Sequence, residues 1–187
     1  GGSHETLTGN RPDWDSIYIE AVHRPAERQA IYGALRETRR FSLSDSEASL
    51  GIYYPVSASW IAVLEASVSP THRVLPKYAA YGQIQKLLGG GWSVGAALRH
   101  SEYATSATNL AALSVERYWG NFRGAYTFYL GRPEGTSSTA SAHAMKLSYY
   151  YGDRDNVSLA YTIGREVENV GSPARLVTTD VQSWAIS

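Results

Sequence analysis

The strongest constraint on the fold is a period-two alternation of polar and apolar side chains that recurs along almost the whole chain. Such alternation puts successive side chains on opposite faces of a β-strand. Gly, Thr, Ser, Tyr and Val are spread through every alternating stretch, and these residues favour pleated backbone over helix. We therefore predict eleven strands, at residues 14–23, 28–39, 47–55, 59–69, 77–87, 92–101, 109–119, 122–130, 141–151, 157–165 and 176–186.

The connections between these strands alternate between short and long. The short ones are predicted at Arg24–Glu27, Pro55–Ser59, Gly89–Gly91, Gly120–Asn121 and Gly152–Asn156. The longer ones are predicted at Arg40–Ser46, Pro70–Pro76, Glu102–Thr108, Gly131–Ala140 and Glu166–Arg175. This asymmetry is typical of outer-membrane β-barrels, whose periplasmic turns are short and whose outer loops are long.

Most of the predicted strands have one apolar row and one more polar row of side chains. In the segment 59–69, for example, Trp60, Leu64 and Val68 lie opposite Glu65 and Ser67. A soluble sandwich would bury its apolar row in a core, with the polar row in bulk water, and that alternative stays open. The Gly, Ser and Ala of the more polar row, with isolated charges, favour a hydrated interior instead. We predict an antiparallel up-and-down transmembrane β-barrel.

The composition supports a membrane barrel over other classes. Charged residues make up 18% of the chain, below the roughly 25% of an average soluble domain. The 17 basic residues balance the 17 acidic ones, which argues against a nucleic-acid partner. No apolar run reaches the about 18 residues of a transmembrane helix. Aromatic side chains gather beside the short turns, where we predict a periplasmic-side girdle: Tyr54, Trp60, Trp92, Trp119, Phe122, Tyr149 and Tyr151.

Alternation also places a set of charged residues on the inner face of the predicted barrel. They are Glu20, Arg36, Glu65, Arg99, Glu116, Arg123 and Lys146. They could line a permeation path, or they could form an internal network that holds the barrel closed, and their mixed signs favour the network. Arg117 falls instead on the lipid-facing row, close to a turn where its long side chain can reach the interface.

The sequence gives no sign of a catalytic, cofactor or metal site. The histidines show no metal-ligand spacing, and the chain has no cysteine. No nucleophile-elbow motif is present, and Gly89–Gly91 lacks the residues of a phosphate loop. We therefore predict no enzyme activity, no cofactor and no metal, and treat a lipid-modifying enzyme as the third alternative.

An ordered set of motifs resembles the YaiO-type outer-membrane β-barrel family. The set covers about residues 11 to 170, and each of its members lies next to a predicted strand end. They are Arg11-Pro12-Asp13-Trp14, Arg40-Phe41 before Asp45, Tyr53-Tyr54-Pro55, Leu88 to Gly95, Glu116 to Phe122, and Tyr149 to Asp153. The resemblance implies a bacterial outer-membrane protein linked to the cell envelope or to exopolysaccharide machinery.

The ends of the chain depart from that resemblance. The family pattern has a strand before the Arg-Pro-Asp-Trp segment, whereas this chain is expected to start inside that loop, and it stops at Ser187 without a terminal aromatic residue. Eleven strands is an odd number, and bacterial single-chain barrels are even-stranded. We expect residues 1–187 to be a single barrel domain, incomplete at both ends, from a barrel of about 12 or 14 strands.

The sequence therefore predicts an outer-membrane channel or export-associated protein with a polar lumen. The alternative is a plugged, structural barrel that anchors a larger envelope assembly. The expected partners of the protein are outer-membrane lipid and, as the resemblance implies, polysaccharide or proteins of the periplasm and envelope.

Overall fold

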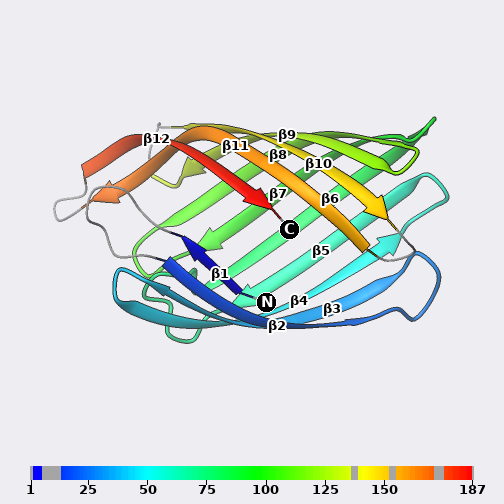
Figure 1. Cartoon of the computed structure of the whole chain (residues 1–187). Helices are drawn as coiled ribbons and strands as arrows, with labels where there is room; N and C mark the ends of the chain where they lie inside the picture. Colours follow the sequence, from blue (N-terminus) through cyan, green and yellow to red (C-terminus); the bar gives the residue numbers. More distant parts are fainter. Residues whose placement is uncertain (1, 6–13, 136–138, 152–154, 171–174, 187) are drawn as a thin grey trace. The chain divides into compact units, whose positions relative to one another are not determined.

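The computed structural model describes residues 2–5, 14–135, 139–151, 155–170 and 175–186. These residues form twelve strands and no helix, and hydrogen bonds pair the strands in sequence order from β1 to β12 (Figure 1). The strands are β1 (Gly2–Glu5), β2 (Trp14–His23), β3 (Ala30–Arg40), β4 (Leu43–Pro55), β5 (Trp60–Val68), β6 (Tyr78–Gly89), β7 (Trp92–Glu102), β8 (Ala107–Trp119), β9 (Phe122–Pro133), β10 (Ala140–Tyr151), β11 (Asp155–Val170) and β12 (Arg175–Ile186). Within this part of the chain, no helix has the length and apolarity needed to cross a membrane.

The eleven predicted strands are all present, and a twelfth precedes them. Strand β1 pairs antiparallel with β2, with Gly2 opposite Ile17 and Glu5 opposite Trp14. The prediction that the chain starts inside a loop is therefore wrong. The polar, glycine-bearing composition of this segment hid the strand, because a four-residue strand is too short to show an alternation.

The predicted long connection at Arg40–Ser46 is a tight turn instead. Strand β3 ends at Arg40 and β4 begins at Leu43, so only Phe41 and Ser42 lie between them. Both have a positive φ, 52° and 62°. Two-residue hairpins that match the twist of their strands require positive φ at both positions, and Asn-Gly is the usual sequence there. Phe-Ser gave no such signal, which is why the turn was missed.

Other connections also differ from the predicted alternation. The one predicted as short at Arg24–Glu27 extends from Arg24 to Gln29, and β11 runs on to Val170, through part of the predicted loop Glu166–Arg175. Residues 136–138, 152–154 and 171–174, which belong to three predicted connections, lie outside the described residues. The difference between the two ends of the strands is therefore smaller than the sequence predicts.

The register separates each group of paired strands into two faces. On what we call the polar face, Arg36 pairs with Tyr18 and Glu47, while Gly51 pairs with Tyr32 and Glu65. On the opposite, apolar face lie most of the large exposed hydrophobic side chains, such as Ile17, Ile19, Leu35, Leu50, Leu64, Leu98, Leu113 and Met145. Few hydrophobic side chains are buried among the described residues: Ile61, Leu75, Ala79 and Ala107. A sheet whose described residues bury so few hydrophobic side chains needs an apolar solvent for its apolar face.

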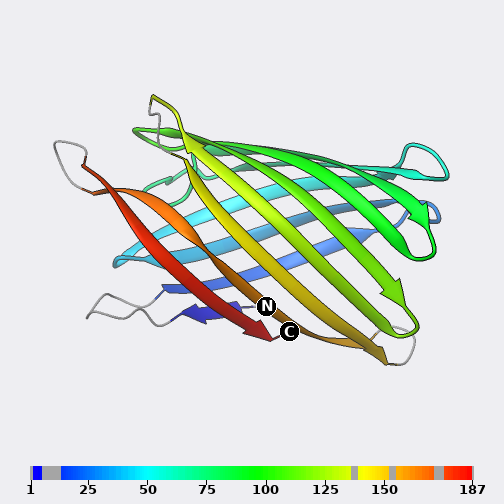
Figure 2. The same cartoon turned by 90° about the horizontal axis from the view of Figure 1, so that it is seen from above.

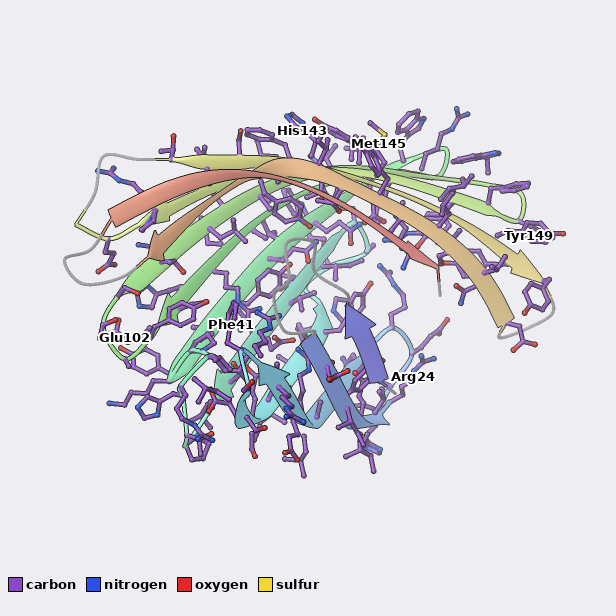
Figure 3. The ribbon with its side chains drawn as sticks, turned by 60° about the vertical axis from the view of Figure 1, so that its left-hand side comes forward. Arg24, Phe41, Glu102, His143, Met145 and Tyr149 are labelled. Carbon is purple, nitrogen blue, oxygen red and sulfur yellow. The ribbon has the colours of Figure 1, made fainter. Side chains whose placement is uncertain are left out.

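The chain divides into two compact units, which are described separately below. Unit 1 comprises Gly1–Gln83 and Arg99–Thr108, and unit 2 comprises Ile84–Leu98 and Asn109–Ser187. Within each unit successive strands lie side by side and antiparallel (Figures 1 and 2). In unit 1, Phe41 and Glu102 lie toward one end of the strands and Arg24 toward the other (Figure 3). We call these ends the loop end and the turn end.

Candidate functional site: the polar face

A glycine brings a tyrosine and a carboxylate together on the polar face of unit 1. Gly51 lies between Tyr32 and Glu65 in the cross-strand register. A Cβ atom at Gly51 would lie 2.2 Å from the Cζ atom of Tyr32, so the tyrosine ring covers the glycine. The ring thereby crosses β4, and its hydroxyl donates a hydrogen bond to Glu65 Oε2 at 3.1 Å. An aromatic ring laid over a glycine on the next strand is a known device for fixing register.

Arg99 completes this group from β7. Its Nη1 atom lies 3.8 Å from Glu65 Oε1, and both side chains remain partly exposed. The contact is therefore a long ion pair in partly hydrated surroundings, where each such pair stabilises a fold by less than about 1 kcal/mol. Sequence alternation placed Glu65 and Arg99 on the same face, and the structure also brings them into contact.

Two other charged residues pair in unit 2. Arg123 Nε and Nη2 donate to the two carboxylate oxygens of Glu116, at 3.0 and 2.8 Å. The guanidinium carbon of Arg123 also lies 5.7 Å from the ring centroid of Tyr118, and that ring lies 6.5 Å from Tyr150. A bidentate carboxylate contact with an aromatic neighbour fixes an arginine more firmly than a single ion pair.

The remaining predicted charges are placed less tightly. Arg36 lies over the ring of Tyr18, with 5.7 Å from its guanidinium carbon to the ring centroid. Glu20 pairs with Ala34, and Lys146 pairs with Ala125 and Ala160, so the register puts both on the polar face, where they are exposed. The structure thus joins four of the seven predicted charges into two separate contacts. Whether any of the seven lines a permeation path stays a prediction.

A buried carboxylate at the loop end of unit 1 was missed as a site by the sequence reasoning. Asp45 is 1% exposed, and its Oδ2 atom accepts hydrogen bonds from the backbone amides of Val74 and Leu75 at 2.5 and 2.9 Å. Arg73 Nε lies 3.5 Å from Oδ1, and Arg73 also donates to the carbonyl of Ser44. Asp45 therefore holds the connection between β5 and β6. Nothing in the local sequence signals this, because its partners lie about thirty residues away.

The same connection is also held by backbone bonds. Ser69 N donates to Lys77 O at 3.0 Å and Lys77 N donates to Glu102 O at 2.6 Å. Near Glu102, Tyr103 is half-buried in the connection between β7 and β8, and burial raises the pKa of its phenol, although Arg99 and Arg40 oppose that shift. Backbone hydrogen bonds thus hold the β5–β6 connection and join it to the end of β7.

The predicted aromatic residues lie on the apolar face beside the turns. In unit 2 four of them form a row in which neighbouring ring centroids are 6.0 Å (Trp119–Phe122), 5.0 Å (Phe122–Tyr149) and 6.4 Å (Tyr149–Tyr151) apart. These four and the other three predicted aromatic residues, Tyr54, Trp60 and Trp92, are all exposed. His143 and Met145 of β10 project from the same side of the ribbon (Figure 3). That this row sits at a membrane interface stays a prediction.

No group of three or more His, Cys, Asp or Glu side chains that could hold a metal ion is found in the described part of the chain. Six of the buried polar side chains are serines, and four of them, Ser69, Ser93, Ser148 and Ser158, bond to one another or to amides. Ser148 Oγ lies 3.0 Å from Ser158 Oγ, and Gln85 Nε2 donates to Ser93 Oγ at 2.8 Å. These contacts stabilise the polar face.

Comparison with known proteins identifies the family. The YaiO membrane beta barrel domain matches residues 1–169. The chain belongs to this family. Its fold is similar to that of a solved structure described as a KdgM porin, with a TM-score of 0.57 and 18% sequence identity over 86% of each chain. No curated protein sequence matches it. The chain is thus a membrane β-barrel protein with a porin-like fold, as the alternating strands and the motif set predicted.

Proposed function

We propose that this YaiO-family chain is an outer-membrane channel whose polar face lines a water-filled lumen. The observation that carries the proposal is the small size of the side chains on that face of unit 2. Away from the strand ends, most positions there are glycine, alanine or threonine: Gly95, Ala97, Ala125, Thr127, Ala142, Ala144, Ala160 and Thr162. Small side chains leave room for water, whereas the filled interior of a small closed barrel needs large ones.

The cross-strand register makes this surface continuous. Thr127, Ala144 and Thr162 form one row across β9, β10 and β11, and Ala125, Lys146 and Ala160 form the next. Lys146 is the single long side chain of the two rows. A surface of this kind offers hydroxyl groups and one cation to a solute that passes along it.

A second candidate is supported by the ion pairs of the polar face. Glu116 and Arg123 neutralise one another through two short hydrogen bonds, and Tyr32 and Arg99 both engage Glu65. Paired charges are what a closed, structural barrel would use to fill its lumen. In that case the protein acts as an anchor in an envelope assembly.

Planar-bilayer recording of the folded protein separates the two candidates. A channel gives stepwise current increments in KCl, and a plugged barrel inserts without current. Insertion is checked on the same samples by heat-modifiable gel mobility. Inserted protein that carries no current would overturn the channel proposal and support the anchor.

The proposal includes a role in export, through the exopolysaccharide link that the resemblance implies. Liposomes that contain the protein should swell in solutions of neutral oligosaccharides, at a rate that falls with oligosaccharide length. Swelling in salt alone would restrict the role to ions. Recovery of the native protein from the outer-membrane fraction tests the proposed location.

A further inference from the structure

A hollow on the apolar face of unit 2 has two cations among its lining residues, Arg117 and Lys146. The register puts the side chain of Lys146 on the polar face, so Arg117 is the cation on the apolar side. The hollow encloses about 590 Å³, within the range of about 300–1,000 Å³ for small-molecule pockets. Trp92, Trp119, Tyr126, Met145, Leu147 and Arg117 are among its lining residues. Except for Arg117, these are apolar or aromatic side chains that are at least one-third exposed.

Arg117 is held in place by an aromatic ring. Its guanidinium carbon lies 5.0 Å from the ring centroid of Trp92, a cation–π contact. The β7 and β8 backbones meet here, because Tyr118 N donates to Gly91 O at 2.9 Å. A Cβ atom at Gly91 would lie only 2.1 Å from the carbonyl oxygen of Tyr118, so the turn packs directly against β8. The Arg117 side chain therefore lies at a defined place beside the Gly89–Gly91 turn.

Among the described residues that line the hollow, the one carboxylate is already neutralised. Glu116 also contributes to the lining, but both of its oxygens accept hydrogen bonds from Arg123 on the polar face. Arg117 thus leaves a positive charge beside an apolar hollow. The floor of the hollow includes Gly124, over which the indole of Trp119 leans, 2.9 Å from where a Cβ would be.

We propose that this hollow binds one anionic phospholipid, with an acyl chain against Tyr126, Met145 and Leu147 and the headgroup phosphate on Arg117. The inference rests on the proposed function in one respect, namely that the apolar face meets membrane lipid. Arg117 lies near the short turns Gly89–Gly91 and Gly120–Asn121. Short turns are periplasmic in outer-membrane barrels, and the aromatic row Trp119, Phe122 and Tyr149 lies beside the second of these turns. A glycerol phospholipid of the inner leaflet presents its phosphate at the level of these turns.

A second copy of the chain fits the hollow less well. An isologous contact would place the same surface of both copies together, so each would bring its own Arg117 to the interface. Two like charges at an apolar contact repel, whereas a phosphate complements the arginine. Charge complementarity therefore favours the lipid.

Native mass spectrometry of the full chain, released from detergent with added phosphatidylglycerol or phosphatidylethanolamine, tests the proposal. Wild type should retain one phosphatidylglycerol in preference to phosphatidylethanolamine. Arg117→Gln should lower that preference roughly fivefold, the factor expected for one basic residue at an anionic headgroup. Leu147→Trp, which fills the hollow, should reduce the retention of both lipids. Lys86→Gln is the matched control, because Lys86 is a cation on the apolar row of β6 that does not line the hollow.

Equal retention of the two lipids by wild type, or an Arg117→Gln preference equal to that of wild type, would overturn the lipid site. A dimer peak in place of the lipid-bound monomer would also overturn it. Conductance and heat-modifiable mobility of Arg117→Gln are measured in parallel, and both should match wild type. If wild type fails to insert, the proposed function fails; if it inserts and conducts without lipid preference, only this inference fails.

Discussion

Arg123 donates two hydrogen bonds to Glu116 across the β8–β9 hairpin, at 3.0 and 2.8 Å, close to the Gly120–Asn121 turn. The pair faces the polar side of unit 2 and is only partly exposed, with 25% of the arginine side chain and 13% of the glutamate side chain accessible. Each residue satisfies the other's charge, so neither can be removed without leaving its partner unsatisfied.

Removing both partners should therefore destabilise the protein by less than the sum of the two single removals. Glu116→Gln and Arg123→Gln should each lower the free energy of unfolding by about 1–3 kcal/mol, the cost of leaving the remaining partner unsatisfied. The double variant should lose less than the sum of the two. Urea unfolding in lipid vesicles measures all three, with Lys146→Gln, an exposed cation of the same face, as the control. Strictly additive losses would contradict coupling between the two side chains.

Substitution of Gly51 should change ion selectivity through Tyr32. A methyl group at position 51 displaces the tyrosine ring and removes its hydrogen bond to Glu65. If the proposed channel is open, the freed carboxylate should increase cation preference in Gly51→Ala and in Tyr32→Phe, while Glu65→Gln should decrease it. Reversal potentials in a KCl gradient give the readout. Gly33→Ala is the matched control, since Gly33 contacts Ser49 and Leu50 instead of Tyr32. An unchanged reversal potential in both Gly51→Ala and Tyr32→Phe would refute the coupling.

Loss of the Asp45 carboxylate should release the connection between β5 and β6. Asp45→Ala leaves the amides of Val74 and Leu75 without their acceptor, so limited trypsin digestion should cut after Arg73 or Lys77 several times faster than in wild type. Mass spectrometry of the fragments locates the cut. Glu47→Gln, two residues along the same row of β4, should digest at the wild-type rate. Equal digestion of Asp45→Ala and wild type would mean that the backbone bonds alone hold the connection.

The burial of Tyr103 predicts a loss of stability at high pH. Because burial raises the pKa of this phenol above its ordinary value, the folded state binds the proton more tightly than the unfolded state. The resulting stabilisation is fully present below the unfolded pKa of about 10 and is lost as pH rises above it. The urea midpoint should therefore fall further between pH 8 and a pH above about 10 in wild type than in Tyr103→Phe. A wild-type fall that persists unchanged in Tyr103→Phe would assign it to other tyrosines.

The strands could be predicted from the sequence because the alternation of apolar and polar residues lies within each strand. In β5, Trp60, Leu64 and Val68 alternate with Glu65 and Ser67, and that local pattern alone fixes the faces. The turn at Phe41 and Ser42 was not predicted, because its positive φ values follow from the pairing of β3 and β4 rather than from residue preference.

The sites required contacts that sequence spacing does not encode. Alternation gave Glu116 and Arg123 the same face, but it could not show that they bond. Asp45 was visible only as part of a family motif, and its partners come from a connection far along the chain. Gly51 could not be predicted as part of a site, because its role depends on the Tyr32 ring that packs over it from the neighbouring strand.

The Tyr32 ring over Gly51 also makes the free width beside the sheet independent of the strand arrangement, although the two are usually coupled in barrels. The clear width of a barrel normally follows from its number of strands and their tilt, which no single substitution alters. At this level of unit 1, the free space above β4 is set by one tyrosine rotamer and one hydrogen bond to Glu65. The width above β4 and the backbone can therefore vary independently here. If the proposed channel is open, rotation of the Tyr32 side chain would admit a larger solute while every strand stays in register.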